Sequence, residues 1–419
     1  MNITYHLHGI AVMLEEGLER SEETDRIAAI WINWQLSRGI KVRPSGRNSP
    51  LHSINFLNID EVHTVKTNPV PFIPVPLPEG IGKLYPMYGL RTHDITEEDI
   101  RMAQLFWTES VFIAKDEDGL TKIDFEKCIS CGKCVSACPF GAVHKKSQII
   151  DILKNIKSGK KVVAMLAPAI MGQLPCTPAQ LKQAILELGF TDVVEVAQGA
   201  DITTKNESEE FKERVKENGA PFMTTSCCAA YNELVEKHIP EIDKYRSTTK
   251  TPAYYTAELV KKEHPEYATV FFSPCVAKRT EASKNPNIDY VLSFEELGAW
   301  FVALNIQVAE CEESEFVTKS SAQARNFAVT GGVAQAVNSL LEDKDKAQPY
   351  VINGLDKSGI RDLKKFAKNG KCELGDLIEV MACPGGCLGG SNTINSYRQA
   401  SKQLGTYVEQ SPQIKDIVK

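Results

Sequence analysis

Long hydrophobic runs are absent from this chain of 419 residues, and so is an excess of basic charge. No apolar run reaches the roughly 18 residues that a membrane-spanning helix needs, so we expect no membrane association. The formal net charge of −6 provides no basic field, so we expect no nucleic-acid partner. The amino terminus lacks the basic start and continuous apolar centre of a signal peptide. A cytoplasmic location is therefore expected.

Cysteine is absent from the first 127 residues, although the chain contains 12 cysteines. Nine of the 12 lie in four short motifs, and three stand alone, namely Cys176, Cys311 and Cys372. In a cytoplasmic protein, such clustering favours metal binding or catalysis over disulfide bonds. We expect the three isolated cysteines to be buried, unreactive thiols.

The first cysteine motif has the C-x-x-C-x-x-C-x-x-x-C-P spacing of bacterial ferredoxins, which predicts a 4Fe-4S cluster. In two-cluster ferredoxins the fourth cysteine of each run binds the other cluster, but this chain has one run and no upstream cysteine. We therefore expect the fourth cysteine to complete its own cluster, with Cys176 or His144 as alternative fourth ligands. The expected ligands are Cys128, Cys131, Cys134 and Cys138.

From Lys160 onward, strand-like apolar runs alternate with helical segments, which predicts an α/β fold. Helices are expected after Thr177-Pro178 and Thr251-Pro252, at about 206–217, and after a capping box formed by Ser293 and Glu296. Several expected strands end just before unusual loops, at Pro168, Cys227-Cys228, Cys275 and Cys383. Ligands of open α/β sheets bind where strands end, so these loops are expected to converge.

Cys383 and Cys387 lie four residues apart among four glycines. This glycine density lets the backbone fold tightly round a bulky object while both thiols face it. Paired zinc ligands are usually closer together, and a redox pair would have the C-x-x-C spacing. An iron-sulfur cluster is therefore favoured.

Three loops together resemble the signature motifs of the iron-only (di-iron) hydrogenases. The family motifs T-S-C-C-P-x-W, M-P-C-x-x-K-x-x-E and E-x-M-x-C-x-x-G-C-x-x-G-G-G occur in that order, as T-S-C-C-A-A-Y, S-P-C-V-A-K-R-T-E and E-V-M-A-C-P-G-G-C-L-G-G-S. With the ferredoxin-type run, the resemblance covers residues 118 to about 400. It implies reversible conversion of protons and electrons to hydrogen at an H-cluster, which is a 4Fe-4S cubane joined to a di-iron unit with CO, cyanide and azadithiolate. Ferredoxin, or a similar electron carrier, and hydrogenase maturation proteins are the partners that it implies.

The resemblance also implies a domain organisation. Residues 1–117, which lack cysteine and any readable catalytic motif, form a segment of unknown role that we expect to be α-rich or irregular. Residues 118–147 form a small ferredoxin-like 4Fe-4S domain. Residues 148–419 form the α/β catalytic domain, with strands ending at the buried cluster.

Single residues take roles from the same resemblance. Cys387 also bridges the cubane to the di-iron unit, Cys227 exchanges protons with the azadithiolate amine, and Lys278 holds a cyanide ligand. Glu281 is expected to pair near Lys278 or with a neighbouring base. The positions around the di-iron unit are matched by Met381, Pro168, Ala169 and Pro274. The cubane ligands are matched by Cys228, Cys275, Cys383 and Cys387.

A proton path to the buried site is implied as well. Glu210, Ser247 and Glu207 are expected to relay protons in this order from Cys227 to the surface. The two glutamates have i, i+3 spacing, which puts them on one face of a helix.

The chain departs from the family pattern at several positions, which permits two other functions. Hydrogen sensing with slow turnover is one alternative. The other is a non-enzymatic iron-sulfur assembly factor, which keeps the cubane but lacks the di-iron unit. The departures are Ala229, Tyr231, Ser273 and Ser391 within the motifs, and Ala169 and Ala253 where the family usually has serine and glutamine.

Overall fold

The computed structural model describes residues 113–115, 121–137, 147–317 and 319–418. Most of the expected amino-terminal segment, together with Cys138 and His144, lies outside these ranges. None of the helices in the described ranges is long and apolar enough to cross a membrane.

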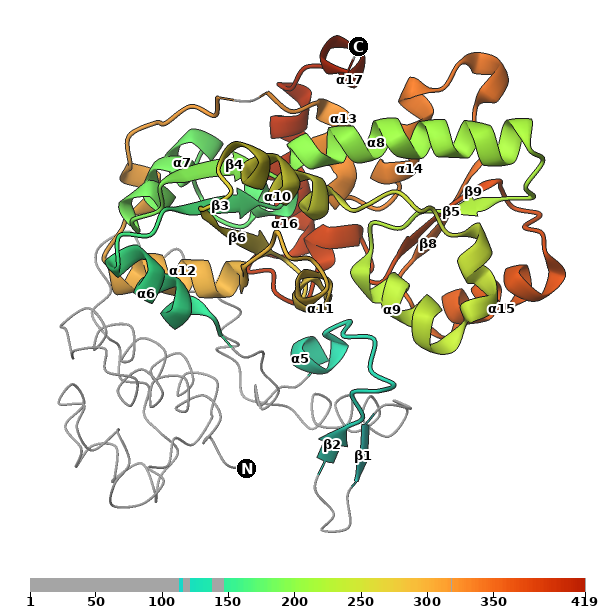
Figure 1. Ribbon diagram of the computed structural model, residues 1–419, viewed down its shortest axis with the longest axis horizontal. Coiled ribbons are helices and arrows are strands. Elements are labelled where there is room, and N and C mark those ends of the chain that lie inside the picture. The colour runs from blue at the N-terminus through green and yellow to red at the C-terminus, as the bar shows by residue number, and fades with distance from the viewer. Residues whose placement is uncertain (1–112, 116–120, 138–146, 318, 419) are drawn as a thin grey trace.

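Two parallel sheets form the centre of the described chain (Figure 1). In the four-stranded sheet, Ala164 pairs with Val193 on one side and Val270 on the other. The three-stranded sheet pairs Thr224 with Ile378. The strand orders are β4 (Asp192–Glu195), β3 (Val162–Leu166), β6 (Ala268–Ser273), β7 (Tyr290–Ser293), and β5 (Met223–Thr224), β9 (Leu377–Met381), β8 (Pro349–Asn353).

Burial on both faces explains the apolar character of the central strands. Every residue of β3, β6 and β9 is buried. Parallel strands covered by helices on both sides have continuous hydrophobic runs of this kind. The α/β fold expected from the sequence is confirmed, and its parallel strands are divided between two sheets.

Helices cover both sheets, and α8 (Ala197–Phe211) runs along the two of them (Figure 1). The four-stranded sheet packs with α6 (Ile149–Lys157), α7 (Pro178–Glu187), α10 (Pro252–Glu263), α12 (Phe294–Ala303) and α16 (Tyr397–Glu409). Near the three-stranded sheet lie α9 (Ala229–His238), α14 (Gly332–Leu340) and α15 (Lys357–Asn369). The shorter helices are α11 (Ala277–Ser283), α13 (Ala322–Arg325) and α17 (Ile414–Ile417).

The expected helix starts are confirmed at their caps. Thr177 accepts a hydrogen bond from the Gln180 amide, and Thr251 accepts one from the Tyr254 amide. Ser293 and Glu296 form the capping box at the start of α12. These caps satisfy amides that a helix leaves unpaired at its first turn.

The helix expected at 206–217 is wrong in its bounds. The α-helix α8 spans Ala197–Phe211, and a π-helical turn follows at Lys212–Glu217. The first residues of α8 are small and do not show the helical spacing of apolar residues, because this end of the helix packs closely on α10. A Cβ added at Gly199 would lie 2.0 Å from the Pro252 carbonyl oxygen.

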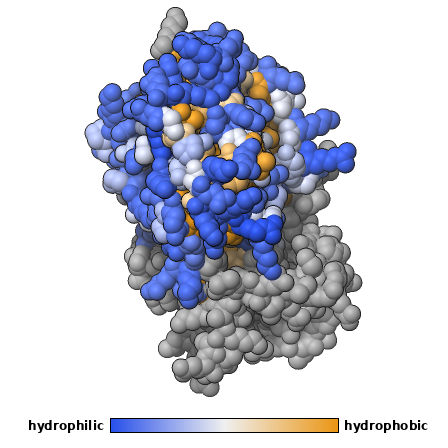
Figure 2. All heavy atoms as spheres, turned by 90° about the vertical axis from the view of Figure 1, so that its right-hand side faces the viewer, coloured by the Kyte–Doolittle hydropathy of each residue, from blue (hydrophilic) through white to orange (hydrophobic). Residues whose placement is uncertain are grey.

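A short ferredoxin-type region precedes the α/β core. It contains the antiparallel pair β1 (Ile113–Lys115) and β2 (Thr121–Ile123), then the cysteine loop and the helix α5 (Lys133–Ala137). The face of the molecule seen in Figure 2 is mostly hydrophilic, with apolar residues showing between polar ones.

The close approach of α8 and α10 gives a stability prediction. Gly199→Ala is expected to lower the free energy of unfolding by about 1–3 kcal/mol, because the added methyl group overlaps the Pro252 carbonyl. Gly405→Ala, inside α16, is the matched control, because nothing lies within 4 Å of its added Cβ. Helix propensity should make this control more stable by about 0.5–1 kcal/mol. Urea unfolding checks both values, and equal effects would contradict the packing explanation.

Candidate metal-cluster site

The cysteine loops follow strands of both sheets and meet at the carboxyl ends of those strands. β5 leads to Cys228, β6 to Cys275, and β9 to Cys383. The second and third loops are joined directly, because the Asn392 amide donates to the Pro274 carbonyl at 2.9 Å. Gly390 permits this contact, since an added Cβ there would lie 2.4 Å from the same carbonyl oxygen.

The four thiols expected to hold the cubane share one partly buried environment. Burial, together with the charge of Cys228, raises the pKa of Cys275 to about 12 and that of Cys387 to about 11. Burial also raises the pKa of Cys383 strongly, with added effects from Cys275, Cys228 and Cys387. The sequence prediction that these loops converge is confirmed.

The donor set fits an iron-sulfur cubane. All eleven described cysteines are free, so no disulfide occupies this position. Within the described ranges, no group of three or more His, Cys, Asp or Glu side chains could hold a single metal ion. A cubane does not need so close a group, because each thiolate binds a different iron. Buried thiols with raised pKa values require positive charge to ionise, and iron supplies it.

Lys278 and Glu281 form a half-buried ion pair beside the first loop. The Lys278 Nζ donates to Glu281 Oε2 at 2.5 Å and to the Cys227 carbonyl at 3.1 Å. Glu281 also accepts a hydrogen bond from the Thr251 hydroxyl. Burial would lower the pKa of Lys278, but the Glu281 carboxylate, together with Cys227 and Cys275, raises this pKa overall. The expected pairing is present, and it holds a charged ammonium next to Cys227.

Three of the residues predicted to border the di-iron unit lie beside the cysteines. Met381 is 2% exposed and belongs to an apolar cluster against which Cys227 and Cys228 pack. Pro168 and Ala169 begin a 3₁₀ turn after β3, and this turn contacts the turn at Gly386–Gly389. Ala169 is fully buried, and the latter turn contains Cys387.

The two glutamates of α8 differ in their surroundings. Glu207 is fully buried, and neither carboxylate oxygen has a hydrogen bond of ordinary geometry within the described residues. Burial raises its pKa to about 8. Burial also raises the pKa of Cys227, and the charge of Glu207 is the second cause of that shift. Glu207 therefore lies close to Cys227.

Glu210 lies nearer to the surface, and hydrogen-bond donors surround its carboxylate. Its carboxylate accepts from the Ser247 hydroxyl at 2.8 Å, from Arg214 at 2.6 Å and from the Thr248 amide at 2.9 Å. Burial would raise the pKa of Glu210, but these hydrogen bonds lower it overall. The order expected from the sequence, with Glu210 next to Cys227, is therefore wrong. Running outward from Cys227, the geometry gives Glu207, then Ser247, then Glu210.

Glu379, the first residue of the third motif, is a further residue of the site, and no role was predicted for it from the sequence. This buried carboxylate accepts from the Gly331 amide at 2.7 Å and the Ala334 amide at 2.9 Å, at the start of α14. Burial raises its pKa to about 7. Glu379 thus ties β9 to α14, and its position in the motif was the available signal.

The ferredoxin-type loop lies against the same site. Burial, together with the charges of Cys131 and Cys128, raises the pKa of Cys134 to about 11. Cys131 in turn affects Cys383, so the two groups of cysteines are neighbours. Cys176, one alternative fourth ligand, instead interacts with Cys311.

A glycine makes the junction between the two groups possible. Gly132 has φ +76, and an added Cβ would lie 2.2 Å from Ser391 Oγ and 3.0 Å from Val276. The cluster loop therefore touches both the second and the third loop. Ser391, a departure from the family pattern, has a buried hydroxyl without a partner among the described residues.

Comparison with known families agrees with this geometry. The family described as "Iron only hydrogenase large subunit, C-terminal domain" matches residues 160–391, and the 4Fe-4S binding domain matches residues 121–144. The chain belongs to the iron-only hydrogenase large-subunit family.

Among known proteins, the chain is similar both to hydrogenases and to iron-sulfur cluster assembly factors. NADP-reducing hydrogenase subunit HndD of Solidesulfovibrio fructosivorans is 28% identical over 63% of this chain and 55% of its own length. The periplasmic [Fe] hydrogenase large subunit of Nitratidesulfovibrio vulgaris is 30% identical over 66% and 86%. Cytosolic Fe-S cluster assembly factor narfl of Xenopus tropicalis is 22% identical over 69% and 75%.

Coverage and structural similarity add two facts. The chain spans less than two thirds of HndD and of iron hydrogenase 1 of Clostridium pasteurianum, at 55% and 64% of their lengths. A solved structure of a variant of [FeFe]-hydrogenase HydA1 from Chlamydomonas reinhardtii has a TM-score of 0.53 at 20% identity. The match covers 64% of this chain and 92% of that chain, so the fold is shared.

The buried Glu207 gives a pH prediction. Folding raises its pKa from 4.5 to about 8, so stability falls as pH rises between these values, where only the folded chain keeps the proton. Glu207→Gln cannot ionise. The melting temperature of this variant minus that of wild type should therefore increase as pH rises from 4.5 to about 8. Glu209→Gln, exposed on the same helix, is the control and should differ from wild type equally at both ends. A Glu207→Gln difference that stays constant with pH would contradict the shifted pKa.

Proposed function

We propose that the chain is an [FeFe] hydrogenase that interconverts hydrogen with protons and electrons. The observation that carries this proposal is the set of polar groups beside the cubane cysteines. A cubane alone needs only four thiolates. Here a half-buried ammonium, a spare thiol and a buried carboxylate lie next to them, contributed by Lys278, Cys227 and Glu207.

The cubane of the H-cluster would be held by Cys228, Cys275, Cys383 and Cys387, and Cys387 would also bind the di-iron unit. When bound, this cofactor supplies the redox chemistry that joins protons and electrons into hydrogen. Lys278 stays charged because of Glu281, so it can hold an anionic cyanide ligand. Met381, Pro168, Ala169 and Pro274 would border the di-iron unit and exclude water from it.

Proton movement would use the buried groups of α8 and the first loop. The thiol of Cys227 exchanges its proton with Glu207, whose pKa of about 8 lets it hold and release a proton near neutral pH. Ser247 lies between the glutamates and donates to Glu210 at 2.8 Å. Glu210, at the outer end, remains ionised and exchanges protons with solvent.

Electrons would pass through a 4Fe-4S cluster held by Cys128, Cys131, Cys134 and Cys138. The contact of Gly132 with Ser391 and Val276 brings this loop against the cubane loops. Ferredoxin or a similar carrier is the proposed external partner. Hydrogenase maturation proteins would install the di-iron unit, since cysteines cannot supply CO or cyanide. The names of the relatives include cytosolic and periplasmic proteins, so the cytoplasmic location stays a prediction.

The departures from the family pattern are accommodated by local hydrogen bonds. Tyr231, in place of tryptophan, bonds to the Thr224 hydroxyl at 2.8 Å. Ser273, in place of methionine, accepts from the Cys275 amide at 3.2 Å. Such groups around a metal centre tune its potential and rate, so slow turnover in a hydrogen sensor is the nearest variant of this function.

An iron-sulfur assembly factor is the second candidate. Relatives with that name match 69% of this chain in one case, which favours it. Such a protein would need the cubane cysteines but not the di-iron unit. The half-buried ion pair of Lys278 and Glu281 would then cost desolvation energy with no ligand to hold.

The test is to mature the chain anaerobically with the di-iron maturation proteins. We expect infrared bands of CO and cyanide, and hydrogen evolution from a reduced dye. Cys227→Ser should keep the bands but lower turnover by about 10²–10⁴-fold, because the proton relay loses its first group. Cys372→Ser, an isolated cysteine, is the control and should match wild type. Cubane signals without CO and cyanide bands would contradict the hydrogenase and support the assembly factor, whereas bands with very slow turnover would indicate a sensor.

A further inference from the structure

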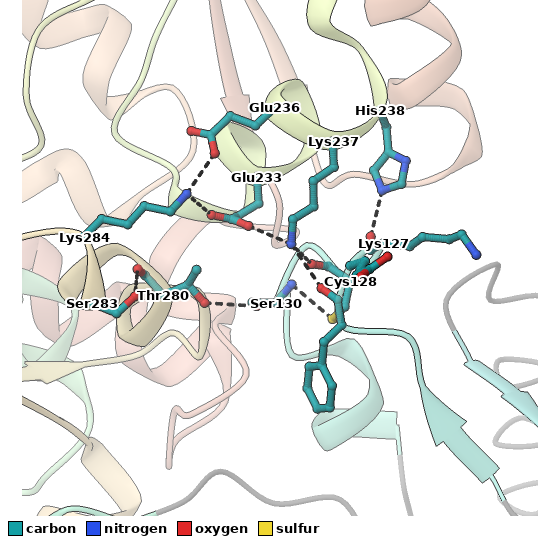
Figure 3. Close-up of polar contacts among 12 residues, drawn as sticks. Lys127, Cys128, Ser130, Glu233, Glu236, Lys237, His238, Thr280, Ser283 and Lys284 are labelled. Atoms are coloured by element: carbon teal, nitrogen blue, oxygen red, sulfur yellow. Dashed lines mark hydrogen bonds and ion pairs between the residues drawn. The ribbon is translucent and has the colours of Figure 1, made fainter.

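The last turn of α9 holds the loop that carries Cys128 (Figure 3). The Lys237 Nζ donates to the Cys128 carbonyl at 2.7 Å and to the Phe125 carbonyl at 3.3 Å. His238 Nε2 lies 2.7 Å from the Lys127 carbonyl. A carbonyl only accepts, so Nε2 carries the hydrogen. Hydrogen bonds from the carboxyl end of α9 to three loop carbonyls thus fix the backbone of the loop.

The ammonium of Lys237 is itself fixed. It pairs with Glu233 Oε2 at 2.9 Å, one turn earlier on α9. Lys284 pairs with the other oxygen of Glu233 at 2.6 Å and with Glu236 at 2.8 Å. Burial would raise the pKa of Glu233, but the two lysines lower it overall, so the carboxylate stays ionised. The Lys237 side chain is 26% exposed, against 53% for Lys284.

The helix connects this clamp to the cubane site. Cys228 is the N-cap of α9, and Lys237 and His238 are its last residues. Ten helical residues span about 15 Å, so α9 is a short rigid spacer between the two cysteine groups. Ile129, 5% exposed in the cluster loop, packs in the same apolar cluster as Cys228 and Cys275.

We propose that Lys237 is a positioning residue that seats the Cys128 loop on α9 and raises the reduction potential of the cluster in that loop. This inference rests on the proposed function in one respect, that the loop binds a 4Fe-4S cluster. Reduction adds negative charge to a cluster, and a nearby fixed cation stabilises the reduced form. Hydrogen bonding and local charge are the recognised means by which a protein sets such potentials.

The experiment reconstitutes the full chain with iron and sulfide alone, without maturation proteins. The midpoint potential is followed by electron paramagnetic resonance, and the signal of this cluster is identified as the one lost in Cys131→Ser. Lys237→Met, which removes the charge and the carbonyl contacts, should shift the midpoint to a more negative value. Lys237→Arg, which keeps the charge, should stay near wild type.

Lys284→Met is the matched control. It removes one charge from the same Glu233 network, but Lys284 makes no contact with a loop carbonyl within the described residues. We expect a clearly smaller shift than for Lys237→Met. Loss of the cluster from Lys237→Met alone, with unchanged circular dichroism, would also support the positioning role.

Two results would overturn the proposal, and they are distinguishable. If Lys237→Met has the wild-type midpoint, or Lys284→Met shifts it equally, the role of Lys237 is wrong while the cluster assignment stands. If the wild-type chain itself shows no signal that depends on Cys131, the cluster assignment is wrong as well.

Discussion

Four thiols that meet at one position form the constraint on which the rest of the structure depends. Burial raises the pKa values of Cys275, Cys383 and Cys387, so added positive charge is needed for these thiols to ionise near neutral pH. An iron-sulfur cubane supplies that charge and takes soft thiolate ligands. Under the proposed function, binding of the cluster would therefore be coupled to the close approach of three remote loops.

The surrounding fold makes this approach possible in steps. Parallel strands of two sheets end at the same place, and glycines allow backbone contacts that a Cβ would prevent, as at Gly390 and Gly132. Buried ions then fix the loops. Lys278 bonds to the first loop and to Glu281, and Glu379 bonds to the start of α14. Each ion is paired or hydrogen-bonded, which offsets part of its desolvation cost.

The sequence alone predicted those parts that depend on local pattern. Motif spacing identified the cysteines, apolar runs identified β3, β6 and β9, and capping residues marked the starts of α7, α10 and α12. It failed where tertiary packing decides. The beginning of α8 lacks the helical spacing of apolar residues, because Gly199 allows a close contact with α10 there. The order of Glu207 and Glu210 depends on depth of burial, and the carbonyl clamp of Lys237 depends on a contact more than a hundred residues distant.

The central claim is that the thiols of Cys228, Cys275, Cys383 and Cys387 share one cubane. Anomalous diffraction at the iron edge, from crystals grown without oxygen, tests it most directly. The account predicts an iron peak within bonding distance of each of these four sulfurs, with a second group of peaks at the loop of Cys128, Cys131 and Cys134. Iron absent from between the four sulfurs, or a disulfide joining two of them in the iron-loaded protein, would contradict it.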